Sequence, residues 1–167
     1  HSPSDPSDGL SAMSSQRLYD TDFYAWTQEQ AERLREVRDN RLDAENLAEE
    51  VADLGKSELR AVEAHLLQLF IHLLKAAFSP ADAPKASWRG EIRQHQLLLR
   101  KAFCPGMRAK IDLIDLWATA VATANDQLAE WGEPTLRPDL ACPFELDHLT
   151  AADFDIDGAI SRLSPRE

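Results

Sequence analysis

The most strongly patterned part of the chain is residues 43–78, where apolar side chains recur at the three- and four-residue spacing of an α-helix. Its first half, from Asp43 to Leu54, has one apolar face and one acidic face. Gly55 then interrupts the pattern and Ser57 can act as a new N-cap, so two consecutive helices are predicted. A single bent helix is the alternative, because one glycine costs only about 1 kcal/mol in a helix interior.

The second half of this stretch, from Ser57 to Phe78, is apolar around most of the helix circumference, which is typical of a helix with neighbours on several sides. It is therefore predicted to form the centre of the core. Its few polar residues lie on one narrow strip: Glu58, His65, Gln68, His72 and Lys75. The strip is either the solvent-facing line of a buried helix or the wall of a polar pocket.

Weaker helical patterns flank the central stretch and predict an all-α fold. An opening helix within 18–40 can be capped by Asp20 or Thr21, and a second helix starts at Ser87. A long helix is predicted from Met107 to Trp131, where Gly132 and Pro134 end it. Residues 136–144 predict an extended loop, followed by one turn at 143–148 and a short helix at 156–163. The expected architecture is an irregular bundle of four to six helices around the central apolar helix.

The length of 167 residues favours a single helical domain, which we place at residues 18–157. Residues 1–17 are rich in Ser, Pro, Asp and Gly, as expected of a disordered leader or of residues added for expression. Residues 158–167 are interpreted as a C-terminal extension.

Charge and cysteine content narrow the class of protein. The net charge of −11 argues against nucleic acid and anionic membranes as main partners, because phosphate binding depends on Lys and Arg. No run of 18 apolar residues is present, so no transmembrane helix is expected. The two cysteines, Cys104 and Cys142, form no CxxC motif, which favours a reduced, cytoplasmic protein.

The distribution of charge leads to the first functional hypothesis. Residues 85–110 carry a net charge of +6, whereas residues 43–53 contain five acids and no base. Pairing of these segments, within one chain or across a dimer, would account for both the basic segment and the acidic segment. We therefore predict a non-enzymatic interaction module that binds itself or another protein. The predicted interaction residues are Trp88, Arg89, Arg93 and Arg100. Nucleic-acid binding through Arg89, Arg93, Arg100 and Lys101 is the least favoured hypothesis.

The alternative hypothesis is a metal-dependent enzyme, with Glu50, Asp53, His65 and His72 as ligands in the bundle core. Carboxylates and histidines on facing helices of a bundle bind divalent metals such as Mn, Fe or Zn. His65 and His72 lie about 10.5 Å apart along a helix axis, so one ion would need ligands from another helix as well. No glycine-rich nucleotide loop or hydrolase motif is present. No organic cofactor is predicted, and the sequence leaves open whether the protein is an enzyme.

The order of several motifs is similar to that of a known bacterial family. The matching pieces are LYDTDFYAWTQEQAERLR at 18–35, LDAENLAEEVADLGKSE at 42–58, HLLK at 72–75, SWRGEI at 87–92 and CPFELDHLTAADF at 142–154. Together they resemble the family called domain of unknown function twenty-nine, over about residues 18–157, with only a loose match between 92 and 111. The resemblance implies an all-helical fold and a prokaryotic cytoplasmic protein. It implies no activity, and no catalytic residue can be transferred from it.

Overall fold

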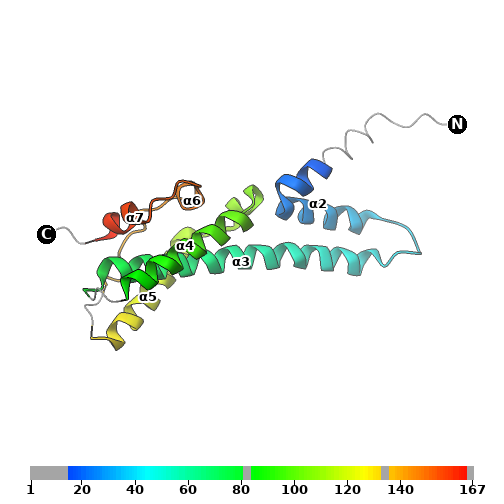
Figure 1. The fold of residues 1–167 in the computed structure, drawn as a ribbon. Helices are drawn as coiled ribbons and strands as arrows, with labels where there is room; N and C mark the ends of the chain where they lie inside the picture. Colours follow the sequence, from blue (N-terminus) through cyan, green and yellow to red (C-terminus); the bar gives the residue numbers. More distant parts are fainter. Residues whose placement is uncertain (1–14, 81–83, 133–135, 165–167) are drawn as a thin grey trace. The chain divides into compact units, whose positions relative to one another are not determined.

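The computed structural model describes residues 15–80, 84–132 and 136–164, and every regular element within these ranges is a helix (Figure 1). Residues 15–21 are helical. The elements that follow are α2 (Phe23–Glu36), α3 (Ala44–Phe78), α4 (Lys85–Ala102), the 3₁₀ helix η1 (Pro105–Lys110), α5 (Leu113–Glu130), α6 (Leu146–Leu149) and α7 (Ile156–Leu163). The predicted all-α class is confirmed.

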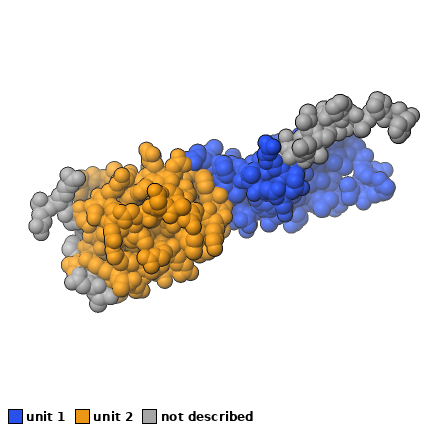
Figure 2. Space-filling model, turned by 45° about the horizontal axis from the view of Figure 1, so that its top comes forward, with its two compact units in different colours: residues 1–60, 104–110 blue, residues 61–103, 111–167 orange. Residues whose placement is uncertain are grey.

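The helices form two compact units (Figure 2). Unit 1 comprises residues 1–60 and 104–110, and its described part contains α2, the first part of α3 and η1. Unit 2 comprises residues 61–103 and 111–167, and its described part contains the rest of α3 with α4, α5, α6 and α7. One continuous helix runs through both units, so this division does not test the prediction of a single domain over 18–157.

The predicted break at Gly55 is wrong, because α3 is a single helix of 35 residues. A Cβ atom placed on Gly55 would overlap with the Oγ1 atom of Thr27 in α2. Thr27 is fully buried, and its hydroxyl donates a hydrogen bond of 2.6 Å to the Tyr24 carbonyl oxygen. Gly55 therefore allows α2 and α3 to approach closely, and Ser57 lies inside the helix instead of capping a new one. The alternative of one continuous helix is confirmed.

A single carboxylate, that of Asp22, organises the rest of unit 1. Its Oδ1 accepts a hydrogen bond of 3.1 Å from the Ala25 backbone N–H and so caps α2, in place of the predicted Asp20 or Thr21. Its Oδ2 accepts a hydrogen bond of 2.7 Å from the Gly106 backbone N–H in η1. The same side chain thus satisfies a free N–H of the helix start and attaches η1 to it.

The core of unit 2 surrounds the second part of α3, as predicted. Its fully buried residues include Leu66, Leu69, Phe70, Leu73 and Leu74. The Phe70 ring packs edge-on against Trp117 of α5, with ring centroids 5.0 Å apart. The Trp117 indole N–H in turn donates a hydrogen bond of 2.7 Å to the Leu140 carbonyl oxygen, which attaches the loop after α5 to the core.

The apolar content of α3 makes it the one described helix that is long and apolar enough to cross a membrane, by length and composition alone. Inside the protein, 44% of its most apolar window is buried, and the core helix of a soluble protein passes the same test. The sequence predicted no transmembrane helix because polar residues interrupt the apolar run. The mean hydropathy of an 18-residue window in α3 is nevertheless 1.3, which is high enough for a membrane span.

Helix α5 starts later than predicted. The expected helix over 107–131 begins only at Leu113, because the Asp112 carboxylate accepts a hydrogen bond of 3.0 Å from the Asp115 N–H and caps the helix there. The predicted C-terminal glycine is confirmed: Gly132 has a φ of +72°. Asn125, which interrupts the apolar stripe, donates a hydrogen bond of 2.9 Å to the Leu136 carbonyl and accepts one from the Leu136 N–H. It therefore holds the following loop.

The segments at the two ends of the predicted domain are partly described. Ala159 and Leu163 of α7 are buried, and residues 158–163 lie within unit 2. Within the predicted leader, residues 15–17 are helical, and residues 1–14 lie outside the described residues. The short helix expected at 156–163 is confirmed.

We expect Gly55→Ala to lower the free energy of unfolding by about 1–3 kcal/mol, because the added methyl group overlaps with the buried Thr27 side chain. Gly90→Ala in α4 is the matched control, since a Cβ there meets no atom within 4 Å. Removing this helix-interior glycine should raise the free energy of unfolding by about 0.5–1 kcal/mol. Urea denaturation followed by circular dichroism measures both changes. A stabilised Gly55→Ala variant would contradict the close helix contact.

Candidate functional site

The polar strip on α3 meets polar residues of α4 and α5 within unit 2. The Nδ1 atom of His65 lies 3.2 Å from the Nδ1 atom of His95 in α4. The rings of His72 and His95 stack, with centroids 5.9 Å apart and planes inclined by 27°. We call this cluster the polar seam, and its members are His65, His72, Lys75, Glu91, His95 and Gln127. The polar strip of α3 is thus half-buried and contacts α4 and α5. Of the two alternatives, this arrangement favours the wall of a polar pocket over a solvent-facing line.

Burial favours the neutral form of the histidines in the polar seam. Burial lowers the pKa of His65, His72 and His95, and repulsion from a neighbouring imidazole lowers those of His65 and His95 further. Glu91 opposes the effect on His95, with its Oε2 atom 3.6 Å from the imidazole Nε2. His72 donates its Nδ1 proton over 2.7 Å to the Gln68 carbonyl oxygen, which leaves Nε2 as an acceptor.

The metal ligands predicted from the sequence are divided between the two units. Glu50 and Asp53 are exposed residues of unit 1, whereas His65 and His72 belong to unit 2. Among the residues that the structure describes, no group of three His, Cys, Asp or Glu side chains is placed to hold a metal ion. Metal binding by His65 and His72 stays a prediction, and His95 is the candidate partner that the sequence did not reveal.

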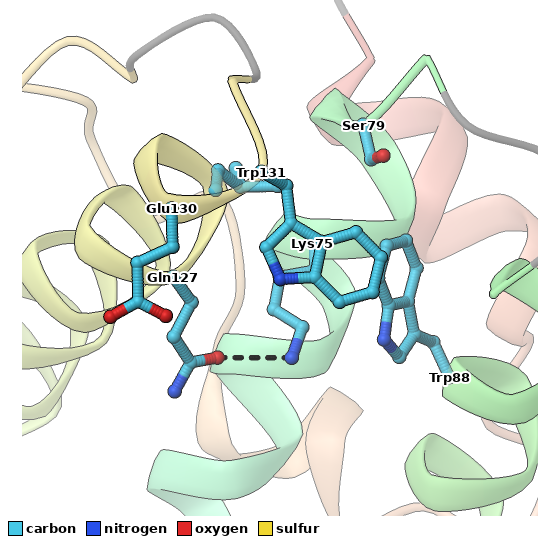
Figure 3. A pocket seen from close by; sticks show the side chains of 7 residues that line it. Lys75, Ser79, Trp88, Gln127, Glu130 and Trp131 are labelled. Atoms are coloured by element: carbon cyan, nitrogen blue, oxygen red, sulfur yellow. Dashed lines mark hydrogen bonds between the residues drawn. The ribbon is translucent and has the colours of Figure 1, made fainter.

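A pocket of about 230 Å³ opens beside the polar seam (Figure 3). Its lining consists of Lys75, Ser79, Trp88, Gln127, Leu128, Glu130 and Trp131. The Lys75 ammonium donates a hydrogen bond of 2.9 Å to the Gln127 side-chain oxygen and lies 5.4 Å from the centroid of the Trp88 ring. Trp88, which was predicted to contact a partner, is 9% exposed and forms a wall of this pocket. Trp131 also lines this pocket, which its sequence position at a helix end did not indicate.

The three predicted interaction arginines lie on the side of α4 that faces α7 and the loop before it. Arg89 forms an ion pair with Asp157, and Arg100 donates a hydrogen bond of 3.3 Å to the Ala152 carbonyl oxygen. Gln96, on the same side, is buried and donates to the Leu149 and Ala151 carbonyl oxygens over 3.1 and 2.8 Å. A groove of about 470 Å³ remains here, lined by Arg93, Gln96, Leu97, Arg100, Ala152, Phe154, Asp155, Ile156 and Asp157.

These features define an all-helical protein whose candidate sites are a histidine-rich seam, an aromatic pocket and a basic groove. The model of the family described as Domain of unknown function DUF29 matches residues 18–155, and the chain belongs to this family. The chain is also similar to a crystal structure described as an alpha-helical protein of unknown function from Rhodospirillum rubrum ATCC 11170. The two share 33% identity with a TM-score of 0.80, over 88% of this chain and 98% of that one. The comparison with curated proteins gives no match.

We expect the free energy of unfolding to fall as the pH is lowered from about 7.5 to 5.5. The unfolded histidines, with ordinary pKa values near 6.5, take up protons in this range that the folded polar seam resists. The unfolded state therefore binds more protons, and stability rises with pH. His95→Gln removes the imidazole shared by the cluster and should flatten this dependence. Urea unfolding at stepped pH measures both slopes, and equal slopes would contradict the coupling.

Proposed function

We propose that the protein is a non-enzymatic, cytoplasmic interaction module that self-associates. In this proposal, the acidic first part of α3 in one copy binds the basic groove beside α4 in another. The observation that carries the proposal is Arg93. Its side chain is exposed at the groove, and in the described part of the chain it has no hydrogen bond or ion pair. An unpaired guanidinium next to apolar groove residues favours a partner that is both acidic and apolar.

The groove side of α4 combines positive charge with an exposed apolar side chain. Leu97 is 38% exposed and lines the groove together with Arg93 and Arg100. The groove also has the apolar side chains of Phe154 and Ile156 in its lining. Arginine and aliphatic surface in one patch are typical of the contact region of a protein interface.

The first part of α3 has the complementary character. Leu47 and Leu54 are 42% and 47% exposed, and their separation of seven residues places them on the same side of the helix, two turns apart. Glu50 is exposed between them, three residues after Leu47 and four before Leu54, and Glu49 and Asp53 are exposed further round the helix. Asp53 has a long ion pair of 4.0 Å with Lys56, so most of this negative charge is available to a second molecule.

A two-fold dimer would use both faces of each copy. In such a dimer, α3 of one copy contacts α4 of the other twice, in two identical contacts. Self-association of this kind pairs the acidic residues 43–53 with the basic residues 85–110 across the dimer, and the charges are expected to favour specificity and association rate. Added salt should weaken the dimer, because surface charges are screened within about 10 Å at 0.1 M salt.

Arg93→Glu is expected to weaken the dimer about tenfold or more at low salt, because it replaces an attraction to the acidic helix by repulsion. Glu50→Arg should weaken it similarly, and the double variant should recover part of the lost affinity. Sedimentation equilibrium at low and high salt measures all three dissociation constants.

The matched control is Arg137→Glu, which changes the net charge equally at a side chain that is 82% exposed and pairs with Asp139. This variant should dimerise like the unchanged protein. A protein that stays monomeric at low salt, or an equal effect of Arg93→Glu and Arg137→Glu, would contradict the proposal.

A metal-dependent enzyme is the second candidate, and one distance favours it. The two Nδ1 atoms of His65 and His95 are 3.2 Å apart. Two nitrogens bonded to one zinc ion at about 2.0–2.1 Å lie a little over 3 Å apart, so the pair has the spacing of two metal ligands. Isothermal titration with ZnCl₂ should then show one site per chain that is lost in both His65→Gln and His95→Gln. Absence of heat in the unchanged protein would exclude zinc.

A further inference from the structure

The pocket beside the polar seam combines aromatic walls with one positive charge. Trp88 and Leu128 are buried and form apolar lining, whereas Trp131 is 66% exposed at the end of α5. The Lys75 ammonium lies between the Gln127 amide and the Trp88 ring (Figure 3). Helices α3, α4 and α5 each contribute to this lining, so the pocket is built on rigid elements.

The Lys75 ammonium has more donors than acceptors. It carries three N–H groups, and Gln127 is its one hydrogen-bond acceptor in the described part of the chain. Half-burial lowers the pKa of this group, and only the more distant Glu91 counteracts the effect. The Gln127 side-chain nitrogen provides two further donors close by, because its oxygen is the atom that Lys75 occupies. An anion in the pocket would therefore receive hydrogen bonds that the protein leaves unused.

We propose that this pocket binds a small, flat aromatic monocarboxylate. The carboxylate accepts hydrogen bonds from the Lys75 ammonium and the Gln127 amide, and the aromatic body packs between Trp88 and Trp131. Stacking would cover the exposed indole of Trp131, which is otherwise a large apolar surface left in water. This site is separate from the α4 face proposed for self-association.

The lining distinguishes this ligand class from others. An organic cation is disfavoured because Lys75 already occupies the face of Trp88. A phosphate group prefers several cationic or backbone donors, whereas this lining offers one lysine and no arginine. Glu130 at the rim disfavours a second negative charge on the ligand. A cavity of about 230 Å³ is smaller than the usual site for a drug-sized molecule and suits one or two fused rings.

The test uses 2-naphthoate as the probe and 2-naphthamide as its neutral analogue of the same shape. Isothermal titration of the full-length protein should give a dissociation constant of about 0.1–1 mM for naphthoate, and at least about tenfold weaker binding for naphthamide. Quenching of tryptophan fluorescence should follow the same curve. Equal affinity for the two probes, or no binding of naphthoate at several times this concentration, would overturn the proposal.

Variants locate the site. Lys75→Met keeps the length of the side chain without its charge, and should weaken naphthoate about tenfold while leaving naphthamide nearly unchanged. Trp131→Ala should weaken both probes, and Glu130→Gln should not weaken either. If Lys75→Met fails to fold, Gln127→Ala on the exposed side of α5 provides the same comparison. Arg93→Glu must bind naphthoate normally, so failure of this proposal is distinguishable from failure of the proposed self-association. Naphthoate affinity unchanged by Lys75→Met and Gln127→Ala would overturn the site.

Discussion

Burial of the apolar second part of α3 is the constraint on which the rest of unit 2 depends. Each fully buried leucine or phenylalanine contributes about 1.5–3 kcal/mol, and α3 supplies several in succession, among them Leu66, Phe70 and Leu73. A helix surrounded on most sides retains only a narrow polar strip. Polar groups on that strip lose water and must find partners in neighbouring helices, which explains the contacts of His65, His72 and Lys75 with α4 and α5.

The chemistry of the candidate sites follows from the same burial. The pKa values of the half-buried imidazoles are lowered because their charged form loses hydration, and the stacked His72 ring lowers the pKa of His95 further. Lys75 experiences the same loss, with Gln127 and the Trp88 ring as partial compensation. One polar strip therefore holds both a cluster of imidazoles with lowered pKa values and the cationic group that lines the pocket.

Unit 1 has the opposite character. Its buried apolar residues are few in the described ranges, namely Tyr24, Ala31, Ala48 and Met107. Close contact between α2 and α3 rests on the absence of a side chain at Gly55, which brings the backbones together without a large core. Leu47 and Leu54 of α3 remain exposed, with the exposed Glu50 between them. A surface of this kind gains most from a partner, which is why the proposed self-association involves this part of α3.

The sequence by itself determined the all-α class, the core segment of α3, the end of α5 at Gly132 and the asymmetry of charge, because these depend on local periodicity, backbone conformation and composition. It did not determine that Gly55 allows helix contact, that Gln96 is buried, or that His95 meets His65. Periodicity shows which residues share a side of one helix but not which helix that side faces. Only the tertiary structure decides that pairing, because it depends on how all the apolar faces are buried together.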